Sequence, residues 1–269
     1  MRRDFVEALA DTWQGTAAVG HELDPEEWDT PTECPGWTVR DQISHMIGTE
    51  AMLLGWPSPP AAPTGLAHVL NPIGAFNEAW VDARRGLAGT AVLAEFEEVT
   101  RLRLAALDAM TDAELDADSD SPIGRVPYRV FMNVRVMDCW VHEQDIRRAV
   151  NRPGHLRGAA AEMTLTRLLG QFGYVVGKRA APPEGTTVYL DITGPVERSV
   201  AVAMEGGRAV PLETVPDAPT TWIVTDSEAY SCLVAGRWTA EEALQRQKVA
   251  VHGDADIGRR IVEQLATLP

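Results

Sequence analysis

Residues 128–150, YRVFMNVRVMDCWVHEQDIRRAV, carry two neighbouring stripes at helical spacing. Side chains three and four residues apart project from the same side of a helix, which has 3.6 residues per turn. The apolar stripe contains Val130, Val134, Met137 and Val141. The polar stripe beside it contains Arg135, Asp138, His142 and Asp145. These polar side chains therefore lie next to the buried face of the predicted helix rather than opposite it.

Within the polar stripe, Asp138 and His142 are one helical turn apart. Their side chains lie about 5–6 Å from each other and can hold one metal ion between them. A third ligand from another helix would complete an open three-ligand site. His45 is the other histidine in the middle of a predicted helix. An Asp and a His at this spacing are also common as a surface pair or a hydrogen-bonded core pair, so spacing alone leaves both interpretations open.

Several other kinds of active site do not fit the sequence. A zincin needs a second histidine four residues after His142, where the chain has Ile146. There is no G-x-S-x-G elbow for a serine hydrolase, no Walker loop and no G-x-G-x-x-G motif. Gly206-Gly207, between two predicted strands, is typical of a hairpin turn.

The first part of the chain has a helical pattern throughout. Its first helix follows from the spacing of Phe5, Leu9 and Trp13. The next helix is predicted to begin at Thr38, because residues 38–41 have the form of a capping box and follow a Pro-Gly turn. Further helices are predicted over residues 75–85, 91–110 and 128–150. The polar segment 116–122 is predicted to be a loop.

The second part has an α+β pattern. Strands are predicted over residues 186–192, 198–204, 221–225 and 249–251, with helices over 226–235 and 255–268. We therefore expect two domains, a helical bundle over residues 1–155 and an α+β domain over residues 156–269. The boundary itself lies between Arg152 and Leu165.

The composition limits the classes of partner and the cellular compartment that we expect for the protein. The 269 residues include 24 Lys and Arg against 39 Asp and Glu, a formal net charge of -15. This balance argues against a nucleic-acid partner and against attachment to an anionic membrane. No apolar run is long enough to span a bilayer, and the N-terminus lacks the pattern of a signal peptide. The three cysteines form no disulfide framework, so we expect a cytoplasmic protein.

Two segments together resemble a known family. Pro31-Thr32-Glu33-Cys34-Pro35-Gly36-Trp37-Thr38-Val39-Arg40-Asp41 with His45 resembles the start of the second helix of the DinB-like, mycothiol-dependent maleylpyruvate isomerases. Residues 135–147 resemble the third core helix of that family. Ala235-Gly236-Arg237 and Val251-His252-Gly253-Asp254 are similar to its C-terminal domain, which is related to sterol-carrier-like α/β folds.

The resemblance implies a DinB-like four-helix bundle that carries a divalent metal, usually zinc, followed by a smaller sterol-carrier-like domain. The family's metal ligands correspond to His45, Asp138 and His142. The isomerase pattern has Glu where this chain has Asp138, which is one methylene shorter and reaches the metal either directly or through water. The resemblance also implies mycothiol, an actinobacterial thiol, as co-substrate. Its metal-bound thiolate would attack an electrophilic small molecule, so that no protein side chain serves as nucleophile.

Three further residues are candidates for supporting roles. Asp145 is a candidate to hold a ligand imidazole through its second nitrogen, or else it forms an ion pair with Arg148. Arg135 either pairs with a carboxylate of the site or forms an ordinary ion pair with Asp138. By resemblance, Arg237 faces the metal cleft and binds a substrate carboxylate; the alternative is a surface arginine.

The activity expected from the resemblance is that of a mycothiol-dependent isomerase or S-transferase. Attack followed by bond rotation and release isomerises a cis double bond, whereas attack without release produces a conjugate. Two alternatives remain from the residues alone. One is a non-catalytic small-molecule or lipid-binding protein with a structural metal, and the other is a metal-water hydrolase that needs no thiol.

Overall fold

The computed structural model describes residues 4–268. It consists of two compact units that divide between Met163 and Thr164. The sequence pattern predicts a domain boundary after residue 155. In the structure, helix α7 (Ala159–Leu169) carries the chain across the division.

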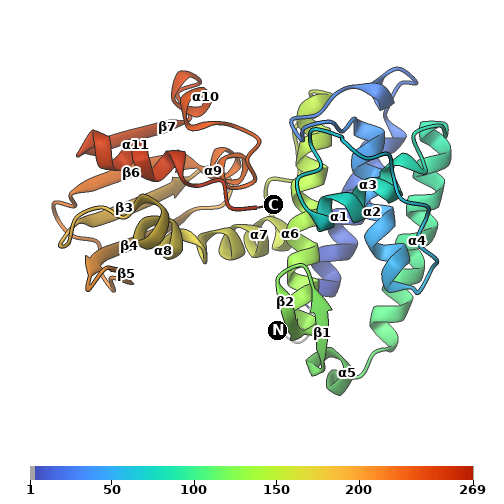
Figure 1. The fold of residues 1–269 in the computed structure, drawn as a ribbon, viewed down its shortest axis with the longest axis horizontal. Coiled ribbons are helices and arrows are strands. Elements are labelled where there is room, and N and C mark those ends of the chain that lie inside the picture. The colour runs from blue at the N-terminus through green and yellow to red at the C-terminus, as the bar shows by residue number, and fades with distance from the viewer. Residues whose placement is uncertain (1–3, 269) are drawn as a thin grey trace. The chain divides into compact units, whose positions relative to one another are not determined.

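Four helices form the body of the first unit: α1 (Asp4–His21), α2 (Val39–Leu53), α4 (Gly89–Ala109) and α6 (Tyr128–Ala149). Helices α1 and α2 each contact both α4 and α6. The four helices lie together in the first unit (Figure 1). Helix α3 (Pro72–Asp82) lies against α2. The side chains buried inside include Leu9, Trp13, Ile43, Phe96 and Met132. The predicted helical bundle is thereby confirmed.

The start of α2 sets the register of that helix. The Thr38 side chain accepts a hydrogen bond from the backbone N–H of Asp41, and the Asp41 side chain accepts one from the backbone N–H of Thr38. This is the predicted capping box, and it satisfies two N–H groups that a helix end would otherwise leave unpaired. Gly36 makes the turn before it with a φ of 79°, which favours glycine. The turn and the cap thus fix where the helix that carries His45 begins.

Helix α3 approaches α2 closely because α2 has a glycine at the contact. A Cβ atom added to Gly48 would lie 2.5 Å from both Cβ and Cγ of Trp80. The Trp80 side chain is buried in this contact. A short 3-10 helix, η1 (Glu27–Asp29), and helix α5 (Asp112–Asp116) complete the connections between the long helices.

The prediction of a loop over residues 116–122 is wrong. Strands β1 (Asp118–Ser121) and β2 (Gly124–Pro127) pair as an antiparallel hairpin. The side chains of β1 are all polar, so this segment has no alternation of apolar and polar residues that would indicate a strand. The backbone ladder to β2 forms the strand instead.

The second unit contains a five-stranded sheet with strand order β5-β4-β3-β6-β7. Its strands are β3 (Thr187–Thr193), β4 (Arg198–Glu205), β5 (Arg208–Pro211), β6 (Thr221–Asp226) and β7 (Val249–Gly253). Neighbouring strands are antiparallel except β3 and β6, which are parallel. Helices α9 (Ser227–Val234) and α11 (Ala255–Glu263) pack on the sheet. The face they cover contains Val188, Leu190, Ile192 and Ile223.

The α+β pattern predicted for this unit is confirmed, and some of its elements differ. The predicted helix over residues 255–268 ends at Glu263. Several short elements had no assignment from the sequence: β5, α8 (Phe172–Tyr174), the π-helix η2 (Val175–Ala180) and α10 (Ala240–Gln245). Segments of three to six residues are too short to show a helical or strand period.

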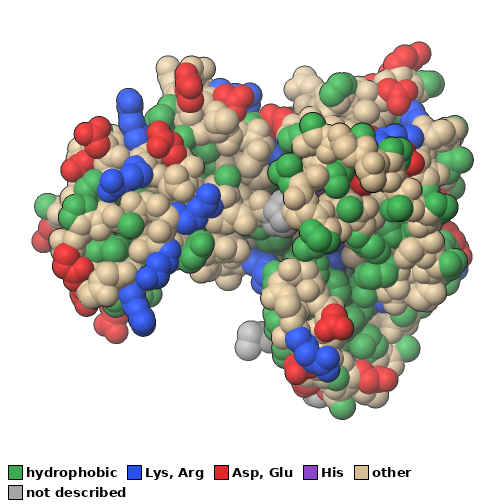
Figure 2. All heavy atoms as spheres, in the orientation of Figure 1, with side chains coloured by type: hydrophobic (Ala, Val, Ile, Leu, Met, Phe, Trp, Pro, Cys, Tyr) green, Lys and Arg blue, Asp and Glu red, His purple; other side chains and the backbone are tan. Residues whose placement is uncertain are grey.

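Across residues 4–268, no helix is both long enough and apolar enough to cross a membrane. Charged side chains of both signs are scattered over the visible face of each unit, among apolar ones (Figure 2).

Candidate metal centre

The three predicted metal ligands meet between two helices of the first unit. His45 comes from the middle of α2, and Asp138 and His142 come from successive turns of α6. One ligand atom from each residue lies within 4.8 Å of the other two. In the described part of the chain, this is the one group of His, Cys, Asp and Glu side chains placed to hold a metal ion.

The distances within the group are short. Nε2 of His45 lies 3.1 Å from Oδ2 of Asp138, and Nε2 of His142 lies 3.6 Å from Oδ1 of the same carboxylate. The two imidazole ring centroids are 4.6 Å apart. The side chains of His45 and His142 are 4% and 9% exposed, whereas that of Asp138 is 28% exposed. The group therefore opens to solvent on the side of Asp138.

Burial and charge set the ionisation of these ligands. Burial lowers the pKa of His45 to about 4, against the opposing effect of Asp138. His45 is therefore neutral near pH 7 and has a lone pair for a metal. Burial opposes ionisation of Asp138, but Arg135 and then the two histidines hold the pKa of this carboxyl well below its usual value. Asp138 is thus an anionic donor.

The indole of Trp37 lies against both imidazoles. Its ring centroid is 5.1 Å from that of His45 and 5.8 Å from that of His142. Its Nε1 donates a hydrogen bond to Oε2 of Glu78 at 2.9 Å, and the same oxygen lies 3.0 Å from Nε2 of His68. A buried carboxylate on α3 therefore holds the ring that packs on the candidate ligands.

Arg135 connects Asp138 to a buried ionic network. Its Nη1 donates to Oδ2 of Asp138, and its Nε donates to Oε1 of Glu50 at 2.9 Å. The other oxygen of Glu50 accepts from Nε of Arg103, also at 2.9 Å. Arg103 donates in turn to the Tyr128 hydroxyl at 2.8 Å. The predicted contact between Arg135 and Asp138 exists, and it belongs to a chain across α2, α4 and α6.

Two side chains contact the second nitrogen of His142. Nδ1 lies in hydrogen-bonding contact with Oε1 of Gln42, and 3.6 Å from Oδ2 of Asp145. Asp145 is fully buried, and its Oδ1 accepts a hydrogen bond from Arg148 at 2.5 Å. Asp145 therefore lies beside the imidazole of His142 and also forms an ion pair with Arg148.

Gln42 and Glu50 are site residues that the sequence did not indicate, whereas Trp37 belongs to the family motif and packs on both imidazoles. Gln42 precedes His45 by three residues on α2, a spacing that could have indicated its place beside the site. Glu50 contacts the site only through Arg135 on another helix, and no local spacing reports that contact.

The donor set fits a divalent cation. Two buried imidazoles and one carboxylate converge, and three protein donors are typical of a catalytic zinc site. Nδ1 of His45 is buried and has no hydrogen-bond partner within residues 4–268. Within these residues, the one hydrogen-bonding contact of the His45 ring is that of Nε2 with Asp138.

Arg237 lies in the second unit, three residues after the end of α9. Its Nη1 donates to the backbone oxygen of Ala235 at 2.9 Å, and the side chain is partly buried. The metal centre lies in the first unit, and a role of Arg237 towards it stays a prediction.

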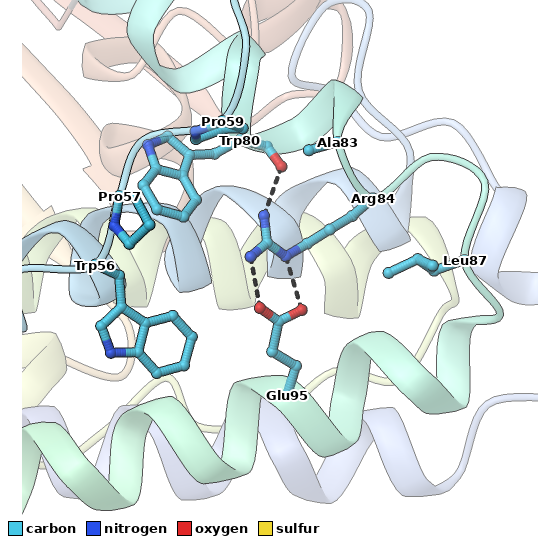
Figure 3. A pocket seen from close by; sticks show the side chains of 8 residues that line it. All are labelled: Trp56, Pro57, Pro59, Trp80, Ala83, Arg84, Leu87 and Glu95. Carbon is cyan, nitrogen blue, oxygen red and sulfur yellow. Dashed lines mark hydrogen bonds and ion pairs between the residues drawn. The ribbon is translucent and has the colours of Figure 1, made fainter.

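A pocket elsewhere in the first unit contains none of the predicted site residues. It is lined by Trp56, Pro57, Pro59, Trp80, Ala83, Arg84, Leu87 and Glu95 (Figure 3). Arg84 donates two hydrogen bonds to the Glu95 carboxylate and one to the backbone oxygen of Trp80 (Figure 3). These charges neutralise each other within the pocket wall.

Comparison with known proteins decides the family. The model of the mycothiol maleylpyruvate isomerase N-terminal domain matches residues 9–147, which include all three candidate ligands. The chain belongs to this family. The expected membership in a family of enzymes is confirmed with it.

Solved structures show the same fold over nearly the whole length of this member of the mycothiol maleylpyruvate isomerase family. The crystal structure of the mycothiol-dependent maleylpyruvate isomerase matches with a TM-score of 0.57 and 15% identity, over 88% of this chain and 90% of that chain. A point mutant of that isomerase matches with a TM-score of 0.59 and 14% identity, over 93% and 92%. The expected order of a helical bundle and then a sheet-containing region is confirmed.

Curated relatives of this family member are found in Mycobacterium tuberculosis. One uncharacterized protein is 28% identical over 181 residues, 65% of this chain and 67% of that protein. Another is 25% identical over 126 residues, 45% of this chain and 54% of that protein.

Proposed function

We propose that this protein is a metal-dependent, mycothiol-dependent isomerase or S-transferase that acts on an electrophilic small molecule. The observation that carries the proposal is the convergence of His45, Asp138 and His142 in the domain that defines the family. These three residues would hold a divalent cation, with zinc as the expected ion. Two neutral imidazoles and one carboxylate leave such a cation positively charged and open to a further ligand.

When bound, the cation would supply stabilisation of a thiolate at neutral pH. The chain's own residues prepare its position. Arg135 keeps the Asp138 carboxylate ionised and engages its Oδ2, so that Oδ1 is the oxygen left for a ligand bond. Trp37 covers one side of the imidazoles, and the more exposed Asp138 marks the side from which mycothiol and the electrophile enter.

The two reactions share their first step. The sulfur of mycothiol forms a bond to one carbon of an activated cis double bond. In isomerisation, the remaining single bond rotates and the carbon–sulfur bond breaks, which regenerates the thiol. In conjugation, the carbon–sulfur bond is kept and the thiol proton ends on the neighbouring carbon. Analysis of the products separates the two reactions, because free mycothiol is recovered after isomerisation and is consumed in conjugation.

Metal analysis of the purified, tag-free protein tests the proposal first. We expect stoichiometric divalent metal in the wild type and loss of that metal in His45→Ala and His142→Ala variants that stay folded. Full metal content in those variants would show that the ligand assignment is wrong.

A cobalt-substituted sample titrated with mycothiol tests the thiol. We expect a thiolate-to-cobalt charge-transfer band as mycothiol binds. Bound cobalt without that band would overturn the thiol proposal, and turnover without mycothiol would favour a metal-water hydrolase.

Arg237 is proposed to bind a carboxylate of the electrophile. An Arg237→Ala variant should then keep full metal content but show a raised KM for the electrophile. An unchanged KM would remove this role.

A further inference from the structure

Gln42 is buried at the point where α2 faces His142. Its side chain is fully covered, and both ends of its amide are engaged. Oε1 contacts Nδ1 of His142, and Nε2 donates to the Thr32 hydroxyl at 2.6 Å. A buried amide with two partners can satisfy both only in one orientation.

The Thr32 hydroxyl decides that orientation. Its hydrogen is donated to the backbone oxygen of Trp37 at 2.8 Å. A hydroxyl has one hydrogen, so Thr32 can only accept from Gln42. The Gln42 NH2 group therefore points to Thr32, and its carbonyl oxygen points to His142. An acceptor beside Nδ1 requires that Nδ1 carry the proton of the neutral ring.

Asp145 lies on the same side of the His142 ring as Gln42. Its Oδ2 lies 3.6 Å from Nδ1 of His142, and the residue is fully buried on α6. Oδ1 of Asp138 lies at the same distance from Nε2, so the two carboxylates oppose each other and the contact with Gln42 decides the tautomer. Two acceptors from different helices thus face Nδ1.

The other nitrogen of His142 then carries the lone pair. Nε2 lies 3.6 Å from Oδ1 of Asp138. With the proton on Nδ1, two lone-pair atoms face each other there, and a cation between them would satisfy both. The chain of hydrogen bonds therefore identifies Nε2 as the atom of His142 that would bind the cation.

We infer that Gln42, oriented by Thr32, is a positioning residue that holds His142 as the Nδ1–H tautomer and presents its Nε2 lone pair to the cation. The inference rests on the proposed function for the cation itself. The loop before α2 thereby has a role in the site. The backbone oxygen of Trp37 orients the Thr32 hydroxyl, the hydroxyl orients the Gln42 amide, and the amide selects the tautomer of His142. Partners of this kind typically change metal affinity by about 10–100-fold when they are removed.

The tautomer is measured directly on 15N-labelled, metal-free wild-type protein, at a pH high enough for the His142 ring to be neutral, by long-range 1H–15N correlation spectra. The His142 signals are assigned with a His142→Ala variant. We expect the pattern of a ring protonated at Nδ1. A ring protonated at Nε2 would overturn the inference. This reading does not depend on whether a metal binds, so it separates failure of the inference from failure of the proposed function.

Three variants test the consequence for zinc affinity, measured by competition with a chelator. Gln42→Met removes the acceptor at nearly constant volume and should weaken zinc binding about 10–100-fold. Gln42→Glu keeps an acceptor at Nδ1 and should bind zinc no more weakly than the wild type. Thr32→Val frees the amide to rotate and should give mixed tautomers with an intermediate loss of affinity.

Circular dichroism checks that each variant is folded. If Gln42→Met does not fold, the zinc affinity of Thr32→Val and the tautomer seen in the wild-type spectrum still test the inference. Wild-type zinc affinity in a folded Gln42→Met or Thr32→Val variant would show that the chain through Gln42 does not position His142. A wild type that binds no zinc would instead overturn the proposed metal centre.

Discussion

Arg135 donates from Nη1 to Oδ2 of Asp138, three residues later on α6. The bond commits one carboxylate oxygen of the candidate ligand and leaves Oδ1 facing His142. Because Glu50 lies between Arg135 and Arg103, two buried arginines are balanced by two carboxylates once Asp138 is ionised. The network therefore couples the charge of the candidate centre to the packing of three helices.

Glu50→Gln should destabilise the protein strongly. The substitution leaves Arg103 and Arg135 buried with one fewer negative charge, and breaking a buried pair in this way costs about 3–5 kcal/mol. Urea unfolding followed by circular dichroism measures the change. Glu98→Gln is the control, because its ion pair with Arg101 is exposed, and this variant should unfold at the wild-type urea concentration. An unfolding free energy of Glu50→Gln equal to that of the wild type would contradict the role given to the network.

Zinc should raise the melting temperature of the wild-type protein. A ligand that binds only the folded state at 100 times its Kd adds about 2.7 kcal/mol to stability. His142→Ala and Asp138→Asn should remove this response in a thermal scan with and without zinc. His21→Ala should keep the full response, because His21 is an exposed histidine at the end of α1. A zinc response that survives both ligand substitutions would place the ion elsewhere.

His155 should make stability depend on pH in the alkaline range. Its Nδ1 lies 2.8 Å from Oε2 of Glu143, and its Nε2 lies 2.9 Å from Oδ2 of Asp11. Hydrogen bonding to Glu143 raises the pKa of His155 to about 9, against the opposing effect of burial. A raised pKa in the folded state means that the charged ring stabilises the protein fully below about pH 6.5.

This contribution should be lost as the pH rises through about 9. Unfolding free energies of the wild type, measured from pH 6 to pH 10, should therefore fall. In His155→Asn the fall should be smaller, and Asn tolerates the φ of 55° at this position. Parallel pH profiles for the two proteins would rule out His155 as the source.

Gly48→Ala should loosen the contact between α2 and α3. The new methyl group would overlap the Trp80 side chain, and overpacking of this kind costs about 1–3 kcal/mol. Gly74→Ala is a matched control in α3, because a Cβ there meets its neighbours at ordinary contact distances of 3.7 Å and more. Thermal unfolding should show a lowered midpoint for Gly48→Ala alone. Equal midpoints for the two variants would mean that the helices adjust without cost.

Features that depend on near neighbours in the chain could be predicted from the sequence. The capping box at Thr38 and the stripe of Asp138 and His142 each lie within one turn of a helix, so residue spacing determines them. His45 was assigned to the site by family resemblance and by its place in a helix. Hairpin β1–β2 was missed because its pairing comes from the backbone and not from an apolar pattern.

The sequence by itself determined the helical first part, the α+β second part and the ligand stripe of α6. Only the tertiary structure decided which partners complete that stripe. Gln42 and Trp37 reach His142 from around α2, and Glu50 reaches Asp138 through Arg135. Such contacts join residues about 85–105 positions apart, and they depend on how α2 and α6 rotate and pack against each other. Periodicity within one helix contains no information on that rotation relative to its neighbour.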